Sequence, residues 1–232
     1  MYNITVAILA AGIPKKMKSY GPTSLIKVDD DRILLDDQIN KIRYIYKNAN
    51  IVIVAGYEFQ KIKRKLKSPK VELIENLHFD STNSAHSLLL ATKNNPVDNL
   101  LMIHGDILFN VDTLKYISNI HYSENSAILY DQNNMIKPNK PGILKNQYVL
   151  EHINYLHKNK WAQIAFFNKG EYNKLLKVNP GNRYSFELIN EINSNENSVF
   201  YCHSPNNMKL IEIECTKDLT SEKFKSINSS SL

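Results

Sequence analysis

Residues 4–10, ITVAILA, form a continuous apolar run that contains β-branched side chains. Such a run is typical of a strand buried on both faces, as the strands of parallel sheets are. Strand patterns alternate with helical patterns four times through the first half of the chain. The predicted strands are 4–10, 25–28, 51–55, 71–75 and 100–104, and the predicted helices are 33–46, 58–67 and 84–93. This alternation predicts a doubly wound α/β domain with a largely parallel sheet.

The second half of the chain has a less regular pattern. Predicted strands are 126–131, 143–153, 161–167, 199–203 and 209–214, and predicted helices are 170–177, 184–192 and 217–226. We expect 143–153 and 161–167 to be antiparallel, and 199–203 to pair with 209–214. Residues 137–142, KPNKPG, form a turn-rich break. With no linker visible, we expect one domain over 1–228, an embellished C-terminal half and a frayed tail at 229–232.

Composition narrows the class of protein. The 232 residues are 43% hydrophobic and 22% charged, as in ordinary globular chains. Cys202 and Cys215 fit neither a disulfide framework nor a zinc site, which indicates a reducing compartment. Without a membrane-length apolar run or a signal peptide, we expect a cytoplasmic protein with no membrane partner. The net charge of +6 comes from scattered lysines, so we expect no nucleic-acid partner.

The loop after the first predicted strand is a candidate anion site. Ala10-Ala11-Gly12 would let backbone N–H groups approach a phosphate closely, and Lys15, Lys16 and Lys18 add positive charge. An ordinary turn with solvated lysines explains these residues equally well. Neither the dinucleotide fingerprint nor the Walker pattern is present, which excludes a Rossmann dehydrogenase and a P-loop enzyme.

Acidic residues at two distant places could hold a divalent metal. Asp106 follows the strand predicted at 100–104, and Mg²⁺ commonly uses one or two such carboxylates. Asp106 could instead cap a helix that starts near residue 111. Glu212 and Glu214 would lie on one face of their strand, where solvated edge charges are the alternative.

Taken together, these segments resemble the sugar-phosphate nucleotidyltransferase superfamily. That family shows LAAGxGxRM, then PKxL, a metal aspartate after the fourth strand, and a late E-I-D segment followed by an acidic-leucine pair. The matching segments are Leu9-Ala10-Ala11-Gly12, Pro22-Thr23-Ser24-Leu25, Gly105-Asp106, Glu212-Ile213-Glu214 and Asp218-Leu219. Residues 83–88, NSAHSL, and 54–57, VAGY, resemble the phosphocholine cytidylyltransferase branch. The resemblance covers about 4–131 and 199–219 and implies a Rossmann-like nucleotidyltransferase fold.

Four positions depart from the family pattern. Pro14 replaces the second glycine and removes one N–H donor from the loop. Lys16 replaces an arginine, so a planar guanidinium that can bind a phosphate through two hydrogen bonds is replaced by a single ammonium group. Thr23 replaces the lysine of PKxL, and Glu214 replaces the second metal aspartate. The acidic pair is therefore better preserved than the cationic groups.

The resemblance implies transfer of a nucleoside monophosphate from a nucleoside triphosphate, with CTP or UTP favoured, to a phosphorylated acceptor. The acceptor would be a sugar 1-phosphate or a phosphocholine-like molecule, and pyrophosphate would leave. It implies Mg²⁺ as cofactor and a monomer or homodimer. The implied catalytic residues are Lys16, Asp106 and Glu214, of which Asp106 and Glu214 bind the metal. The nucleotide would contact Leu9, Ala10, Ala11, Gly12, Gln60, Asn83 and Ser84, and the acceptor Lys27, Asp131, Trp161 and Glu187.

Two other functions compete with this interpretation. The departures at Pro14 and Thr23 would also suit a catalytically silent relative that binds nucleotides as a regulatory module. A glycosyltransferase normally has two aspartates one residue apart after the fourth strand, and Asp106-Ile107-Leu108 lacks the second.

Overall fold

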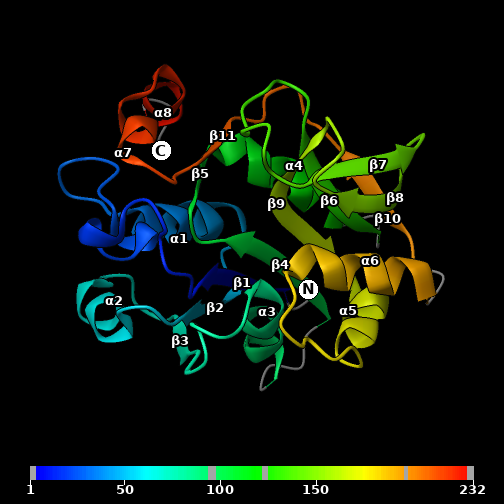
Figure 1. Cartoon of the computed structure of the whole chain (residues 1–232), viewed down its shortest axis with the longest axis horizontal. Coiled ribbons are helices and arrows are strands. Elements are labelled where there is room, and N and C mark those ends of the chain that lie inside the picture. Colours follow the sequence, from blue (N-terminus) through cyan, green and yellow to red (C-terminus); the bar gives the residue numbers. More distant parts are fainter. Residues whose placement is uncertain (1–3, 94–97, 122–124, 196–197, 229–232) are drawn as a thin grey trace.

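A nine-stranded mixed sheet forms the centre of the computed structural model, which describes residues 4–93, 98–121, 125–195 and 198–228 (Figure 1). The strand order is β3-β2-β1-β4-β9-β6-β10-β8-β7, and β11 and β5 form a separate two-stranded ribbon. The strands are β1 (Ile4–Ala10), β2 (Asn50–Ala55), β3 (Glu72–Glu75), β4 (Asn99–His104), β5 (Ile107–Phe109), β6 (Ser126–Asp131), β7 (Gly142–Asn146), β8 (Val149–Asn154), β9 (Lys160–Phe167), β10 (Phe200–His203) and β11 (Leu210–Glu212).

Helices cover both faces of the sheet, so the predicted doubly wound α/β class is confirmed. The α-helices are α1 (Leu34–Ile45), α2 (Phe59–Lys65), α3 (Ser84–Thr92), α4 (Val111–His121), α5 (Lys169–Leu175), α6 (Ser185–Asn195), α7 (Thr216–Thr220) and α8 (Glu222–Asn228). Buried side chains of α1, α2 and α4 share one apolar core with β1, and those of α3, α5 and α6 share a second core on the other face. None of the helices in the described ranges is long and apolar enough to cross a bilayer.

The order of the first four strands creates a switch point. From β1 the chain runs outward through β2 and β3 on one side, and β4 then pairs with β1 on the other side. All four strands are parallel, so the carboxyl ends of β1 and β4 meet at one edge. Ligands of open α/β sheets bind at such a position.

Four predicted elements differ from the structure. The strand predicted at 25–28 does not form: residues 23–25 are a short 3-10 helix, and Lys27 makes an isolated β-bridge with Ile33. The strand predicted at 143–153 is the hairpin β7–β8, which turns at Gln147 with a φ of 52°. Strands β10 and β11 do not pair with each other: β10 pairs with β6 and β8, and β11 pairs with β5. The last helix breaks at Ser221 into α7 and α8.

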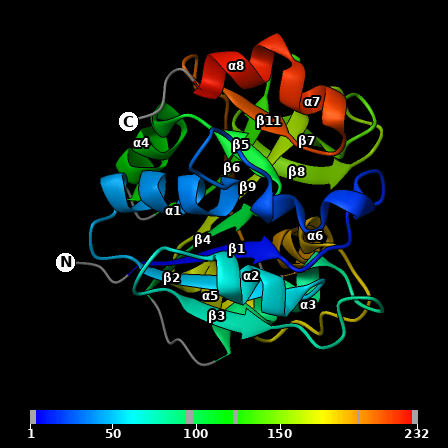
Figure 2. The ribbon, with the colours of Figure 1, turned by 90° about the vertical axis from the view of Figure 1, so that its left-hand side faces the viewer.

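A third apolar cluster lies beneath α7 and α8. It joins Phe224 and Ile227 of α8 to Leu108 of β5, Ile211 of β11 and Met17 of the loop after β1. Figure 2 shows α7 and α8 above the β5–β11 ribbon. The cluster therefore packs the end of the described chain against the loop that follows the first strand. The tail predicted to fray, 229–232, lies outside the described residues.

Candidate active site

The loop after β1 opens at the switch point. Gly105 lies against it: its N–H donates to the Leu9 carbonyl (2.8 Å), and a Cβ on Gly105 would come within 2.7 Å of the Ala10 Cβ. Ala11 is buried, whereas Gly12 is exposed and a Cβ there would have no atom within 4 Å. The loop is therefore packed tightly at its base and open at Gly12.

The turn between β4 and β5 places Asp106 beside the late acidic segment. The Ile213 N–H donates to the Asp106 carbonyl (2.8 Å), and Glu212 is the register partner of Ile107 in the β5–β11 ribbon. Asn110 directly precedes α4 and accepts a hydrogen bond from the Thr113 hydroxyl (2.8 Å). Asn110, not Asp106, thus occupies the start of that helix.

Two carboxylate oxygens in this region are buried without a hydrogen bond. They are Asp106 Oδ1 and Glu212 Oε2, and neither has a partner in the part of the chain that the structure describes. Glu212 is 5% exposed, and burial together with the Asp106 charge raises its pKa to about 7. Two mutually repelling carboxylates, each with one buried oxygen that has no hydrogen bond within the described residues, suit a hard dication with oxygen ligands.

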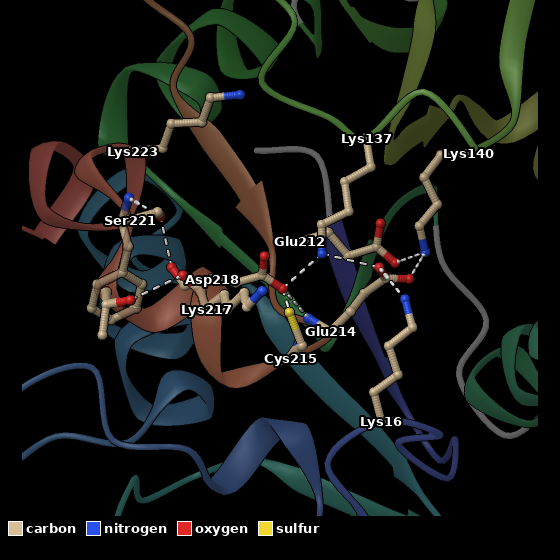
Figure 3. Close-up of polar contacts among 12 residues, drawn as sticks. Lys16, Lys137, Lys140, Glu212, Glu214, Cys215, Lys217, Asp218, Ser221 and Lys223 are labelled. Atoms are coloured by element: carbon tan, nitrogen blue, oxygen red, sulfur yellow. Dashed lines mark hydrogen bonds and ion pairs between the residues drawn. The ribbon is translucent and has the colours of Figure 1, made fainter.

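A cluster of lysines surrounds the late acidic segment (Figure 3). Lys140 Nζ pairs with both Glu212 and Glu214. Lys137 Nζ lies 3.0 Å from Glu214 Oε2 and 2.8 Å from Asp218 Oδ2. Lys16 Nζ, from the loop after β1, lies 3.7 Å from Glu214 Oε2, and its side chain is 61% exposed. Three lysines from two loops therefore converge on one group of carboxylates.

The lysines and carboxylates shift each other's pKa. Burial disfavours the charged form of Lys140, but the Glu212 and Glu214 carboxylates outweigh it and raise the pKa of Lys140 to about 12. Burial acts against ionised Glu214 as well, yet Lys140 and Lys137 hold the pKa of Glu214 below its ordinary value. Asp218 follows the same rule, since Lys137 and the N–H groups of Glu214 and Cys215 lower its pKa despite burial. Lys140, Glu214 and Asp218 are therefore charged near neutral pH.

We compared the sequence and the fold of this chain with those of known proteins. No family model matches the chain. The bifunctional protein GlmU of Nostoc sp. (strain PCC 7120) is 31% identical over 125 residues, which cover 53% of this chain and 27% of that protein. The inositol-1-phosphate CTP transferase from T. maritima superposes with a TM-score of 0.80 at 18% identity, over 99% of this chain and 96% of that one. The chain has a nucleotidyltransferase fold. Its resemblance to the sugar-phosphate nucleotidyltransferase superfamily is confirmed.

A second solved structure has the same nucleotidyltransferase fold. CTP:phosphocholine cytidylyltransferase (LicC) from Streptococcus pneumoniae superposes with a TM-score of 0.71 at 16% identity, over 94% of this chain and 96% of that one. At these identities the structural likeness shows the fold. The sequence match to GlmU spans about a quarter of that relative's length.

The predicted nucleotide-binding residues lie on three elements of the nucleotidyltransferase fold. Leu9 to Gly12 lie at the switch point. Ser84 begins α3, where its hydroxyl accepts from the Ser185 N–H (2.8 Å), and the Ser185 hydroxyl contacts His104 Nε2 (3.1 Å). Asn83 binds Asn182 through its side chain (2.6 Å). Gln60 is exposed on α2, and its carbonyl accepts from Arg64. Their contacts with a nucleotide stay predictions.

The predicted acceptor residues make contacts within the chain. Lys27 donates to the Asp30 carbonyl in its own turn (2.7 Å). Both carboxylate oxygens of Asp131 accept backbone hydrogen bonds, from the Asn133 N–H (2.8 Å) and the Ile136 N–H (2.6 Å). Trp161 is buried edge-on against His104, and Glu187 accepts from the Tyr184 N–H (2.6 Å). Asp131 therefore shapes the loop that carries Lys137, and the acceptor roles of all four residues stay predictions.

Sequence reasoning missed Lys137 and Lys140. Their segment, 137–142, reads as a turn-rich break, and its lysines look like solvated loop residues. One signal was available, because this loop follows β6, which runs parallel to β10 and ends on Asp131. A polar loop after a buried strand of an α/β sheet is a common place for site residues.

Proposed function

We propose that this chain is a Mg²⁺-dependent nucleotidyltransferase that transfers a nucleoside monophosphate, from CTP or UTP, to a phosphorylated small molecule. One observation carries the proposal: Asp106 Oδ1 and Glu212 Oε2 are buried and have no hydrogen bond within the described residues, and Gly105, next to Asp106, lies against the end of β1 where the loop to Gly12 starts. A buried carboxylate oxygen without a hydrogen bond is costly, and a bound dication would offset that cost.

The metal would be held by Asp106 together with the Glu212-Ile213-Glu214 segment. Sequence similarity favours Glu214 as the second ligand, whereas the structure supports Glu212. Glu214 pairs with three lysines, Lys137, Lys140 and Lys16, whereas within the described part of the chain Glu212 pairs with Lys140 alone, keeps one oxygen without a hydrogen bond and is repelled by the Asp106 charge. Mg²⁺ bound there would supply positive charge to the phosphate oxygens during transfer.

The residues of the chain would position the reactants and neutralise charge. A phosphate oxygen of the acceptor attacks the α-phosphorus, the bond from the α-phosphorus to the bridging oxygen breaks, and pyrophosphate leaves with its electron pair. Because the acceptor phosphate is already ionised near neutral pH, no general base is needed. The Ala11 and Gly12 N–H groups and Lys16 would bind the triphosphate.

Lys137 and Lys140 would supply the cations that Thr23 cannot. Their ammonium groups form ion pairs with Glu212, Glu214 and Asp218. A metal ion bound to the carboxylates would weaken those pairs and free a lysine for a substrate phosphate. The proposal therefore accounts for the missing PKxL lysine with residues from another loop.

A group of aromatic side chains near Lys140 could contribute to acceptor binding, since Tyr155 lies close enough to Lys140 to feel its charge. Tyr184 stacks on Phe186 (5.8 Å between ring centroids, 8° between planes), and Tyr155 packs edge-on against Phe186 at 5.9 Å. Aromatic faces of this kind would suit a quaternary ammonium such as a choline head group. A sugar 1-phosphate is the other acceptor to be tested. We retain the prediction of a monomer or homodimer, which light scattering would test.

Pyrophosphate release tests the function directly. The protein is incubated with each nucleoside triphosphate, Mg²⁺ and a panel of phosphorylated acceptors, and Asp106→Ala serves as the site variant. We expect release with CTP or UTP and one acceptor, and a loss of about 100- to 1,000-fold in the variant. Circular dichroism checks that the variant is folded. Calorimetry that shows nucleotide binding without pyrophosphate release would instead favour the silent relative.

A further inference from the structure

A buried amide on α1 contacts the turn that carries Asp106. Gln38 is 0% exposed, and its Nε2 donates to two backbone carbonyls, His104 O at 3.0 Å and Ile107 O at 2.7 Å. These two carbonyls lie on either side of Gly105-Asp106. One side chain therefore bridges both ends of the turn.

Packing alone does not explain a glutamine at this position. Leu35, Ile39 and Ile42 of α1 are apolar and fill the core against β1, whereas Gln38 lies with the buried polar residues Asp37 and Lys41 of the same helix. Gln38 Oε1 is buried and accepts no hydrogen bond from any residue that the structure describes. A buried amide whose oxygen accepts no hydrogen bond lowers stability, and an apolar residue would avoid this cost. We therefore infer that the two hydrogen bonds donated by Gln38 stabilise a particular conformation of the turn.

The next turn of α1 continues the same contact. Lys41 is buried, and its Nζ donates to the Phe109 carbonyl (2.7 Å) and pairs with Asp37 Oδ2 (2.6 Å). Arg32 pairs with the other oxygen of Asp37 at 3.2 Å. Helix α1 thus holds three carbonyls between residues 104 and 109, which fixes β5 and the turn before it.

The remaining sides of the turn are held by backbone bonds. Gly105 donates to Leu9 of β1, and Asp106 accepts from Ile213, next to β11 (both 2.8 Å). Gln38 closes the third side. Because Glu212 approaches from β11, a small rotation of the turn would change the separation of the two free carboxylate oxygens.

We propose that Gln38 is a positioning residue that orients the Asp106 carboxylate so that Asp106 and Glu212 can share one divalent cation. This inference rests on the proposed function. Residues that orient metal ligands typically contribute about 10- to 100-fold in metal affinity or activity. Gln38 touches neither the metal nor the substrate and acts through the backbone of the turn.

Asn193 offers a matched control on the far side of the molecule. Its Nδ2 also donates to two strand carbonyls, Leu150 O at 3.0 Å and Glu151 O at 3.3 Å, and its Oδ1 is likewise buried without a partner in the described ranges. It lies on α6 and contacts β8. Asn193→Leu therefore removes equivalent hydrogen bonds away from the Asp106 turn.

The experiment measures Mn²⁺ binding by electron paramagnetic resonance on the full chain without nucleotide, for the wild type, Gln38→Leu and Asn193→Leu. We expect Gln38→Leu to weaken Mn²⁺ binding by about tenfold or more and to lower kcat similarly. Asn193→Leu should bind Mn²⁺ like the wild type. If Gln38→Leu does not fold, Gln38→Met, which keeps the length of the side chain, gives the same comparison.

Equal Mn²⁺ affinity in the wild type and the Gln38 variants would overturn the positioning role while leaving the proposed function intact. Absence of Mn²⁺ binding and of pyrophosphate release in the wild type would instead overturn both. Equal weakening in Asn193→Leu would show a general loss of rigidity and would also overturn the assignment.

Discussion

Replacing Asp106 by Asn should stabilise the metal-free protein and abolish its response to Mg²⁺. The pKa of Glu212 rises from an ordinary value of 4.5 to about 7, so keeping Glu212 ionised above that pH costs about 3 kcal/mol. Burial is the larger cause and the Asp106 charge the second. We therefore assign about 1 kcal/mol to Asp106, which corresponds to a rise in Tm of about 2–4 °C for a chain of this size.

The assay is thermal unfolding at about pH 8, where Glu212 is ionised, with EDTA and with Mg²⁺. In EDTA the Asp106→Asn variant should melt above the wild type. With Mg²⁺ and CTP or UTP, only the wild type should gain stability, because ligands raise Tm by binding the folded state.

Asp131→Asn is the matched control for this prediction. Asp131 is buried, and both of its oxygens accept backbone hydrogen bonds, so its replacement should destabilise the protein by about 1–3 kcal/mol in either buffer. If Asp106→Asn lowers Tm in EDTA as Asp131→Asn does, Asp106 is a structural residue and our account of the site is wrong.

Three further predictions concern other parts of the molecule. The pKa of Lys140 rises from 10.5 to about 12, so Lys140→Met should lower the free energy of unfolding by about 2 kcal/mol in urea titrations. If the Lys140→Met variant releases pyrophosphate at the wild-type rate, Lys140 does not contact a substrate phosphate. Gly105→Ala should lower the free energy of unfolding by about 1–3 kcal/mol because the new Cβ would collide with Ala10, whereas Gly12→Ala should change it by less than about 0.5 kcal/mol. Equal effects of the two substitutions would contradict the close packing of Gly105 against Ala10. Burial lowers the pKa of His203 below 6.5, so stability falls as the pH drops from about 6.5 through the folded-state pKa. His203→Gln should flatten this slope, which is at most about 1.4 kcal/mol per pH unit, and an unchanged slope would assign the proton to another group.

Strands β1, β2 and β4 could be predicted because they are buried on both faces. Continuous apolar runs such as Ile51–Ala55 have no other common explanation when helical patterns flank them. The hairpin at Gln147 could not be recognised, because neither glycine nor proline marks its turn and the left-handed residue is a glutamine. The pairing of β11 with β5 was also hidden, since β5 is a three-residue strand between a turn and a helix.

The candidate site was predictable where a motif marks it. Asp106 and the Glu212-Ile213-Glu214 segment carry family spacing, and their neighbourhood in the structure agrees with it. Lys137 and Lys140 carry no motif, and their position depends on the course of a loop that Asp131 organises. Gln38 looks like any residue on a helix in the sequence, and only the fold reveals the carbonyls that it contacts.

The antiparallel strand β9 lies between β4 and β6 in the sheet, although it follows both along the chain. During synthesis, β4 therefore has an unpaired side until Phe167 and its neighbours have emerged from the ribosome. Contacts between residues so far apart in sequence slow folding, and an apolar strand edge left open invites association with other chains. A nascent chain that stalls between β6 and β9 would thus expose an open edge of β4 until β9 pairs with it.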